Sequence, residues 1–551
     1  MTITLPLPLR TYQYRTLTVF SLLDTDTDRV LPQLFEMCVK GGRSSRSRTD
    51  AKDYDGYRRT MLASRTVEGF DDHPRDLALL DGWLRSCVVD MGAVGRANTG
   101  EQMLAVAPST LAVYRAGLPK ERHRHRGIDD VVYRLMLEAV SRQGRAEDTG
   151  VATAELRDLV TRTIGRGLAI GPGPRWEPRL EDPAALDIGA LLAFRFVEGF
   201  DMGDAREVDT DAADSSLPGV AAALGDTLLA HLRVYGERLP VPALMSSFAA
   251  VMALGLFTFS LRADAAAHHL LRTGERPGDL GDGPAPASPL EMYCDFTGDL
   301  GSESDRLSRR CVERDLDRVR LAFRDRMTFV VVEQALPRIA GELERLAGAS
   351  RADRLVRLAE LRDHRRVESY AEGRIDDLVA EAADSDEATG PELDFLRKVQ
   401  GADTSELDKL LDIVEHVNQT RAMKNAVAWF WSVGALEKPY GLLRGSSRHR
   451  RSWRYAPGDE LLTALLMAVF VDEDGRSSRE TMSLREVLDA LANRFGILVD
   501  RPPAFLDGAE AREAATANRN AFTQRLQLLG CFDSLSDDFS VQIVRHPLGA
   551  A

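Results

Sequence analysis

Residues 243–261 read ALMSSFAAVMALGLFTFSL, a stretch without a single charged side chain. Its length approaches the roughly 20 apolar residues that a helix needs to cross a bilayer. Three serines, one threonine and one glycine dilute its apolar character, and nothing else in the chain resembles a membrane protein. We therefore predict that 243–261 is a buried central helix, and we predict no membrane partner.

The sequence on the C-terminal side of this helix predicts a linker and then a long helix. Residues 273–289 (TGERPGDLGDGPAPASP) contain too many glycines and prolines for a continuous helix. Residues 305–347 place apolar side chains at helical spacing, beginning with Leu307 and Cys311. Pro337 should kink or divide this helix. Further helical patterns extend to residue 433, so the predicted fold class is mainly α.

A length of 551 residues predicts about three or four domains. Composition shifts and breaks give their boundaries. We predict an N-terminal mixed, mostly helical domain at 1–150, a helical domain with the buried helix at 151–272, the linker at 273–289, a long-helix array at 290–436 and a C-terminal winged-helix-like domain with a basic upstream loop at 437–551.

The overall charge limits contact with nucleic acid. The chain carries 85 acidic and 71 basic residues, a formal charge of -14, so the molecule as a whole repels a polyanion. Any contact with nucleic acid then requires a local basic face. Five scattered cysteines without a CxxC pair indicate reduced thiols, and residues 1–9 lack the basic start of a signal peptide, so we expect a cytoplasmic protein.

The pattern after residue 455 predicts three helices and a hairpin. Ser483 and Glu486 have the spacing of a capping box, and Gly496 follows the helix where a left-handed cap is favoured. A third helix is predicted at 509–529, and a β-hairpin should follow with its turn at 536–538. Helices followed by a hairpin are typical of a winged helix, whose last helix can enter a major groove.

The third helix carries side chains of the types that contact phosphates and bases. Acidic neighbours such as Glu510 and Glu513 keep another interpretation open, because many winged helices bind only protein. The candidate DNA-binding residues on this helix are Arg512, Asn518, Arg519, Asn520, Gln524 and Arg525.

The most basic window of the chain lies just upstream, at 444–455, and no acidic residue occurs between 438 and 458. Its arginines and aromatic residues could hold a phosphate backbone and stack on bases. A solvated loop that pairs with carboxylates of this acidic protein is an equal alternative. The candidates here are Arg444, Arg448, Arg450, Arg451, Trp453 and Arg454.

No catalytic motif is recognisable in the sequence. We find no phosphate-binding loop, no nucleotide fingerprint and no nucleophile with a base, so we predict no catalytic residue, metal ligand or cofactor. Asp50 and Lys52, with the acidic residues at 24–28, superficially resemble a metal-dependent nuclease. The pattern lies in a polar loop and arises readily by chance, which leaves a cryptic nuclease as a minor alternative.

The C-terminal segments resemble a known class of protein. They are Tyr455-Ala-Pro-Gly-Asp-Glu-Leu-Leu462, Arg494-Phe-Gly-Ile-Leu498, Arg525-Leu-Gln-Leu-Leu-Gly530 and Leu535-Ser-Asp-Asp538. This region resembles the tail of accessory proteins from bacterial multi-gene anti-phage defence systems, methylation-associated or phosphorothioation-linked. The resemblance implies a non-enzymatic subunit that helps an assembly recognise or hold DNA.

Three functions follow as expectations. The leading one is a DNA-linked scaffold or adaptor whose partners are other subunits of the same system and double-stranded DNA. The second is a structural subunit that binds only proteins. The third is the nuclease.

Overall fold

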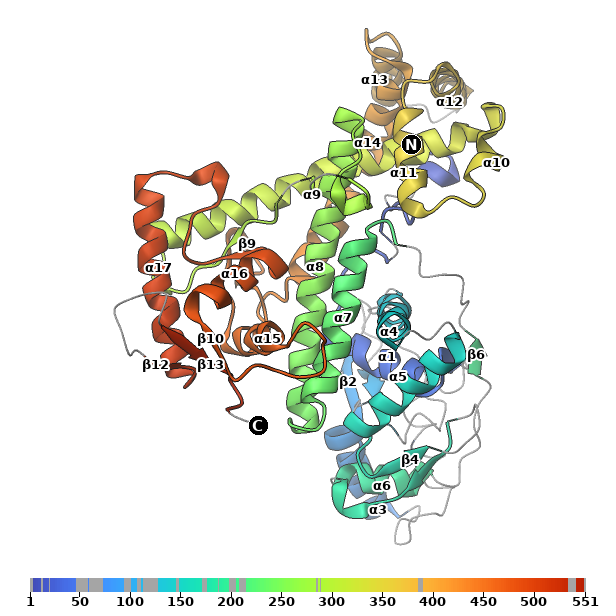
Figure 1. Cartoon of the computed structure of the whole chain (residues 1–551). Helices are drawn as coiled ribbons and strands as arrows, with labels where there is room; N and C mark the ends of the chain where they lie inside the picture. The colour runs from blue at the N-terminus through green and yellow to red at the C-terminus, as the bar shows by residue number, and fades with distance from the viewer. Residues whose placement is uncertain are drawn as a thin grey trace.

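The computed structural model of the chain shows a mainly helical protein (Figure 1). The fold class predicted from the periodicity is therefore confirmed at this level. The structure describes residues 3–10, 13–18, 20–45, 58, 73–93, 101–106, 111, 127–144, 148–170, 176–186, 188–197, 205–207, 215–283, 286–287, 289–384, 390–533 and 542–549.

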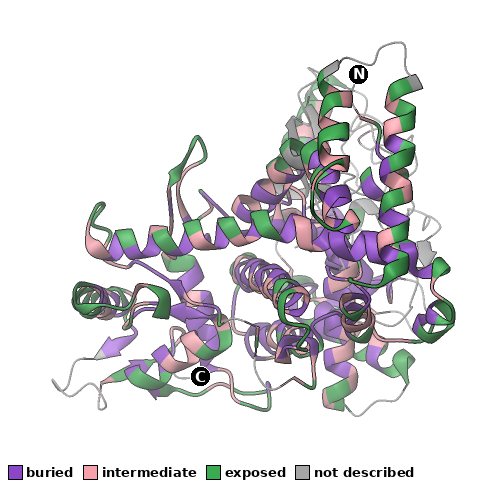
Figure 2. Ribbon diagram, turned by 90° about the horizontal axis from the view of Figure 1, so that it is seen from above, coloured by how far each residue is buried: buried purple, intermediate pink, exposed green. Residues whose placement is uncertain are grey.

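Helix α8 (Val241–Thr273) forms the centre of the molecule, as the apolar stretch predicted. It packs against α7 (Pro218–Tyr235), α9 (Glu303–Ala335), α14 (Glu406–Val433) and α15 (Asp459–Phe470). By length and composition α8 could cross a membrane, yet 72% of its most apolar window is buried inside the protein. Figure 2 shows buried residues concentrated where the long helices cross. The predicted buried helix is confirmed.

Helix α9 is the long amphipathic helix that the sequence predicted. It begins at a serine cap, because the Ser302 hydroxyl accepts a hydrogen bond from the Asp305 amide at 3.1 Å. It ends at Ala335, where a short 3₁₀ helix (Leu336–Arg338) contains Pro337. Proline cannot continue the hydrogen-bond ladder, which explains the predicted break at this position.

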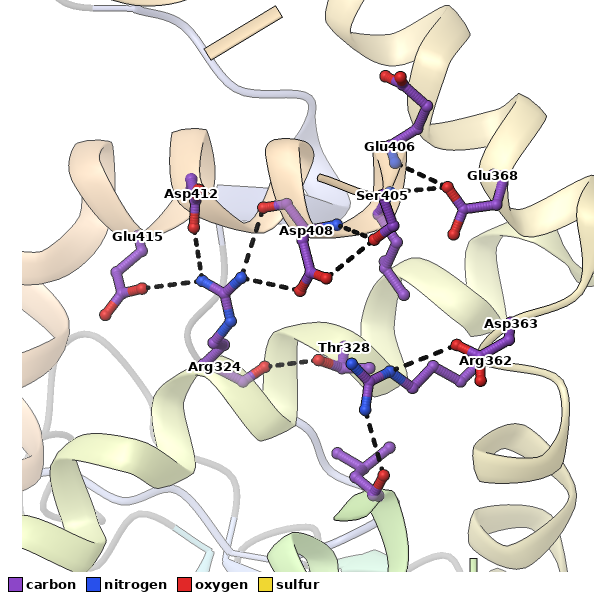
Figure 3. A network of polar contacts seen from close by, with 12 residues as sticks. Arg324, Thr328, Arg362, Asp363, Glu368, Ser405, Glu406, Asp408, Asp412 and Glu415 are labelled. Atoms are coloured by element: carbon purple, nitrogen blue, oxygen red, sulfur yellow. Dashed lines mark hydrogen bonds and ion pairs between the residues drawn. The ribbon is translucent and has the colours of Figure 1, made fainter. Parts of the chain in front are cut away.

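One arginine joins α9 to α14 (Figure 3). Arg324 of α9 lies 2.9 Å from Asp408, 2.7 Å from Asp412 and 3.3 Å from Glu415. The three carboxylates follow one face of α14 and would repel one another without this guanidinium. Hydrogen bonds from Arg324 and Ser405 outweigh burial and lower the pKa of the Asp408 carboxyl.

The N-terminal elements and the C-terminal elements lie on opposite sides of α7 and α8 (Figure 1). Helix α1 packs on α4 and α5, and α4 packs on α7. These elements are α1 (Val30–Val39), α3 (Pro74–Trp83), α4 (Ile128–Gly144), α5 (Thr149–Thr163) and α6 (Ile188–Val197), with three antiparallel strand pairs, β1 (Arg43–Ser45) with β6 (Ala205–Glu207), β2 (Val89–Ala93) with β3 (Glu101–Val106), and β4 (Leu168–Ile170) with β5 (Pro178–Leu180).

Four shorter helices gather around the end of α9 and the start of α14 (Figure 1). They are α10 (Glu342–Leu346), α11 (Arg351–Glu360), α12 (Arg365–Asp384) and α13 (Gly390–Gln400). Single-turn helices occur elsewhere at Leu7–Arg10, Thr27–Arg29, Gly278–Leu280, Pro183–Ala185 and Ala504–Leu506, and a π-helix at Leu84–Val88.

The C-terminal unit contains three helices and a three-stranded sheet. Its elements follow the chain as α15, β10 (Thr481–Ser483), α16 (Leu484–Phe495), α17 (Ala509–Leu528), β12 (Phe532–Asp533) and β13 (Ile543–Arg545), and the strand order is β10-β13-β12, all antiparallel. The Ser483–Glu486 capping box and the left-handed Gly496 cap are both confirmed. The predicted turn at 536–538 lies outside the described residues.

This unit is tied to the helical body by a strand pair that the sequence did not predict. Strand β11 (Ile497–Leu498) pairs in parallel with β7 (Met292–Tyr293), which follows the predicted linker. Within that linker, Leu280 is buried, and the Asp279 carboxylate lies 3.2 Å from Arg262 of α8. Part of the predicted linker 273–289 therefore lies against the helical body. The domain boundaries given above remain predictions.

Candidate nucleic-acid interface

The basic window forms a β-hairpin, which corrects the prediction of a loop. Strands β8 (Leu443–Ser446) and β9 (His449–Tyr455) pair in antiparallel register. In β9 the side chains alternate, since Trp453 and Tyr455 are buried while Arg454 between them is partly exposed. The sequence did not predict this strand, because residues 449–451 are exposed on both faces of the hairpin and are all basic. Alternation between polar and apolar side chains begins only at Trp453.

The aromatic residues of the hairpin belong to the protein core. Trp453 is 2% exposed, its ring lies parallel to Phe430 with centroids 6.3 Å apart, and its indole donates to the Ser446 carbonyl at 2.9 Å. The Tyr455 hydroxyl donates to Asp315 of α9 at 2.9 Å. Trp453 was a candidate for stacking on bases, but its position leaves no ring face for a ligand.

Two of the candidate arginines make structural contacts at the base of the hairpin. The Arg454 Nε atom lies 3.4 Å from Asp305 Oδ1, a carboxylate in the first turn of α9. The Arg444 guanidinium donates to the carbonyls of Lys438 and Pro439 at 3.0 and 3.2 Å. Burial and the nearby Arg454 charge lower the pKa of Arg444. Arg454 therefore pairs with a carboxylate of the protein itself, which was the alternative to phosphate binding for this window.

The end of the hairpin is different, because Arg448, Arg450 and Arg451 are exposed together with His449. Among the described residues, none of these three arginines has a carboxylate within ion-pair distance. In the turn of the hairpin, the Glu437 carboxylate accepts a hydrogen bond from the Ser447 amide at 3.2 Å. We call Arg448, Arg450 and Arg451 the hairpin tip; they place a local positive charge on an otherwise acidic protein.

Helix α17 presents a mixed outer face. A helical stripe of buried residues, Ala511, Ala515, Asn518, Phe522 and Leu526, faces the protein, and α17 packs against α9. Of the remaining candidates, Arg519 is half-buried, and Asn520 and Gln524 are exposed.

The two exposed arginines of α17 are paired with carboxylates. Arg512 Nε donates to Asp507 at 2.7 Å, and Arg525 pairs with Asp459 at the start of α15. They lie 13 positions apart, which is roughly 20 Å along a helix. Asp459 follows β9 closely in the chain, so Arg525 lies nearer to the base of the hairpin than to its tip.

Asn518 is buried rather than exposed on the face of α17. Its side-chain oxygen accepts from the Phe296 amide at 2.7 Å, and its nitrogen donates to the carbonyls of Cys294 and Val499 at 2.8 and 3.0 Å. These bonds use the whole amide to hold α17 on the β7–β11 pair. Helical phase would have indicated this position, because 511, 515, 518, 522 and 526 share one face.

The described residues contain no group of three or more histidine, cysteine or acidic side chains able to hold a metal ion. The nuclease-like residues Asp50 and Lys52 lie outside the described part of the chain. The described residues thus supply an exposed cluster of cations at the hairpin tip and, separately, a helix with a polar outer face; the cluster of cations can hold a polyanion.

Comparison with known proteins gives one match. A family model described as "Methylation-associated defense system protein MAD7" matches residues 9–548. The match covers nearly the whole chain and includes the C-terminal segments on which the resemblance was based. No curated protein and no solved structure matches the chain.

Proposed function

The chain belongs to the family of methylation-associated defense system protein MAD7, and on this basis we propose that it is a non-enzymatic, DNA-linked adaptor of that system. Family membership implies a component of a methylation-associated anti-phage defence system, and a multi-gene system implies other protein partners. The adaptor role and the contact with DNA are our proposal, which is supported by the C-terminal unit and by the hairpin tip.

We infer that the C-terminal unit is a winged helix. Apart from β11, which pairs with β7 outside the unit, its main elements follow the order helix, strand, helix, helix, strand, strand, and the first strand lies beside the last. In that arrangement α17 would be the helix that faces a groove. Its exposed Asn520 and Gln524 are amides of the kind that read adenine edges, whereas Arg512 and Arg525 would first have to leave their carboxylates.

The observation that carries the proposal is the hairpin tip. Three exposed arginines without carboxylate partners among the described residues are held on a rigid base, because Trp453 and Tyr455 fix β9 to the core. Phosphate contacts by arginine release counterions and supply affinity that does not depend on base sequence. The remainder of this acidic protein's surface repels the duplex, so affinity for DNA has to come from a local basic patch such as the hairpin tip.

The experiment is a salt titration of DNA binding by the full chain. We expect a labelled duplex of about 30 base pairs to bind with an affinity that falls steeply as salt rises. Arg448→Ala, Arg450→Ala and Arg451→Ala in combination should reduce the slope of log affinity against log salt by about 3, since each lost phosphate contact contributes roughly 0.9.

The matched control combines Arg306→Ala, Arg320→Ala and Arg485→Ala, which changes the net charge equally. These arginines are exposed, and each has a carboxylate three or four positions away on its own helix. The control should keep most of the slope. If the full chain shows no salt-dependent affinity, or if both triple variants bind alike, the DNA contact assigned to the hairpin tip is wrong.

One observation favours a protein-binding subunit as the second candidate. Leu528 at the end of α17 is 80% exposed, and Ile543 of β13 is 37% exposed. Leu528 lies a few residues before β12, and Ile543 pairs with Asp533 of β12, so we propose that both belong to one apolar patch that a partner protein covers. Co-purification of the chain with a protein of the same gene cluster, lost with Leu528→Glu but kept with Gln524→Glu, would support this function.

A further inference from the structure

A pocket of about 390 Å³ lies between α7, α8 and the C-terminal end of α16, and no residue of the hairpin tip lines it. Its volume falls within the range of roughly 300 to 1,000 Å³ that small-molecule sites occupy. Apolar side chains form much of its wall, among them Val220, Leu224 and Val251. Polar residues also line it, namely Thr227, Thr258, Arg262, Asn493 and Arg494.

Two glycines help to form this pocket. A Cβ atom at Gly255 would lie 2.2 Å from Leu224 Cδ1, so α7 and α8 approach closely at this point. A Cβ atom at Gly219 would meet no atom within 4 Å, so the side of α7 that faces the pocket is open there. The absence of a side chain therefore lets the two helices approach closely at Gly255 and leaves the pocket open at Gly219.

The charges in the pocket are not balanced. Arg262 lies 3.2 Å from Asp279 and is neutralised by it. Arg494 donates to the Ala468 carbonyl at 2.7 Å, and no carboxylate of a described residue lies within ion-pair distance of it. Its guanidinium also lies 5.4 Å from the centroid of the Phe495 ring. Arg494 therefore supplies one uncompensated positive charge with remaining N–H donors, next to an apolar wall.

We propose that this pocket binds a small organic monoanion that has an acidic head group and an apolar body. Arg494 holds the head group through charge-assisted hydrogen bonds, and Val220, Leu224 and Val251 enclose the body. Thr227 and Thr258 donate their hydroxyl protons to helix carbonyls at 2.7 and 3.1 Å, so they offer no donor to the head group, and Arg494 is the residue that holds it. A polyanion does not fit, because only one cation of the pocket is unpaired.

The test compares naphthalene-1-sulfonate with the neutral naphthalene-1-sulfonamide in calorimetric titrations of the full chain. The two probes share an apolar body and differ in charge. We expect the sulfonate to bind about tenfold more tightly, the effect of one charge-assisted hydrogen bond. Arg494→Gln should remove the difference, whereas Arg485→Gln, which removes an exposed charge on the same helix, should preserve it.

A second variant tests the pocket itself. Gly219→Leu adds a side chain where the structure has open space, so the fold should tolerate it and sulfonate binding should be lost. The proposal is overturned if the two probes bind equally, if neither binds, or if Arg494→Gln or Gly219→Leu binds the sulfonate as the parent does. DNA affinity is measured alongside and should not change, so this result is independent of the proposed function.

Discussion

The side-chain amide of Asn518 pairs with backbone groups of residues 294, 296 and 499 at once. A leucine of similar size would leave all three buried groups without partners. Because an unpaired buried polar group costs about 1 to 3 kcal/mol, Asn518→Leu should lower the free energy of unfolding by roughly 2 to 4 kcal/mol in urea titrations. Asn520→Leu, on the exposed face, should change it by less than about 0.5 kcal/mol.

Together the two variants test whether Asn518 stabilises the fold or contacts DNA. A stable Asn518→Leu protein with weakened DNA binding would contradict the structural role and restore Asn518 as a contact residue. The sequence alone suggested DNA contact because amides are suited to reading bases, whereas the helical spacing of Asn518 from Ala515 and Phe522 would have placed it on the buried face.

Two buried histidines are held in their neutral form. The Tyr235 hydroxyl donates to the Met467 carbonyl at 2.7 Å, so it accepts from His546 Nε2 at 2.9 Å, and His546 Nδ1 accepts from the Leu548 amide at 3.1 Å. Burial and the nearby charge of Arg238 lower the pKa of His546 to about 4. Burial alone lowers the pKa of His231, which contacts Ser247, to about 4.

Stability should therefore fall in mildly acidic solution. Between the unfolded pKa of about 6.5 and the folded pKa, the unfolded chain binds protons that the folded chain does not, so unfolding is favoured as the pH drops through this window. Each histidine should contribute a loss of about 1.4 kcal/mol per pH unit. Urea titrations at several pH values should show a shallower dependence of stability on pH for His231→Gln than for the parent.

At the scale of single elements, local signals predicted helix ends well. Ser483 and Glu486, Gly496 and Pro337 each lie where a helix begins or ends, because caps and breakers act through neighbouring backbone groups. The β8–β9 hairpin was missed, since its exposed arginines mask the alternation. Strands β7 and β11 have two residues each and carry no periodicity to detect.

The capping box offers a direct test at this scale. The Ser483 hydroxyl accepts from the Glu486 amide at 3.2 Å, and the Glu486 carboxylate accepts from the Ser483 amide at 2.7 Å. Ser483→Ala should lower the free energy of unfolding by about 1 kcal/mol. Ser483→Thr retains the cap and suits strand β10, so its unfolding midpoint should stay close to that of the parent; equal losses for both variants would exclude a capping effect.

At the scale of the whole molecule, the arrangement of the long helices depends on contacts between distant segments. Helix α15 packs on α8, Trp453 stacks on Phe430, and β11 pairs with β7. None of these contacts has a signature in a single sequence, because periodicity identifies an apolar face without naming its partner. The buried role of α8 was predictable for this reason, and its neighbours were not.

These contacts predict how the chain responds to division. A fragment of residues 437–551 alone should be insoluble or unfolded, because the faces that pack on α8 and β7 would be exposed. The same fragment co-expressed with residues 1–436 should form a complex that stays together in gel filtration. Cooperative unfolding of the isolated 437–551 fragment would instead show that this region is an independent domain.

The parallel pairing of Met292 with Ile497 has a consequence for synthesis in the cell. When β7 leaves the ribosome, about two hundred further residues must be translated before its partner exists, which takes roughly ten seconds or longer at bacterial speeds. During that interval the nascent chain displays the apolar side of α8 that α15 later covers. Its yield should therefore depend on chaperones that bind unfinished polypeptides.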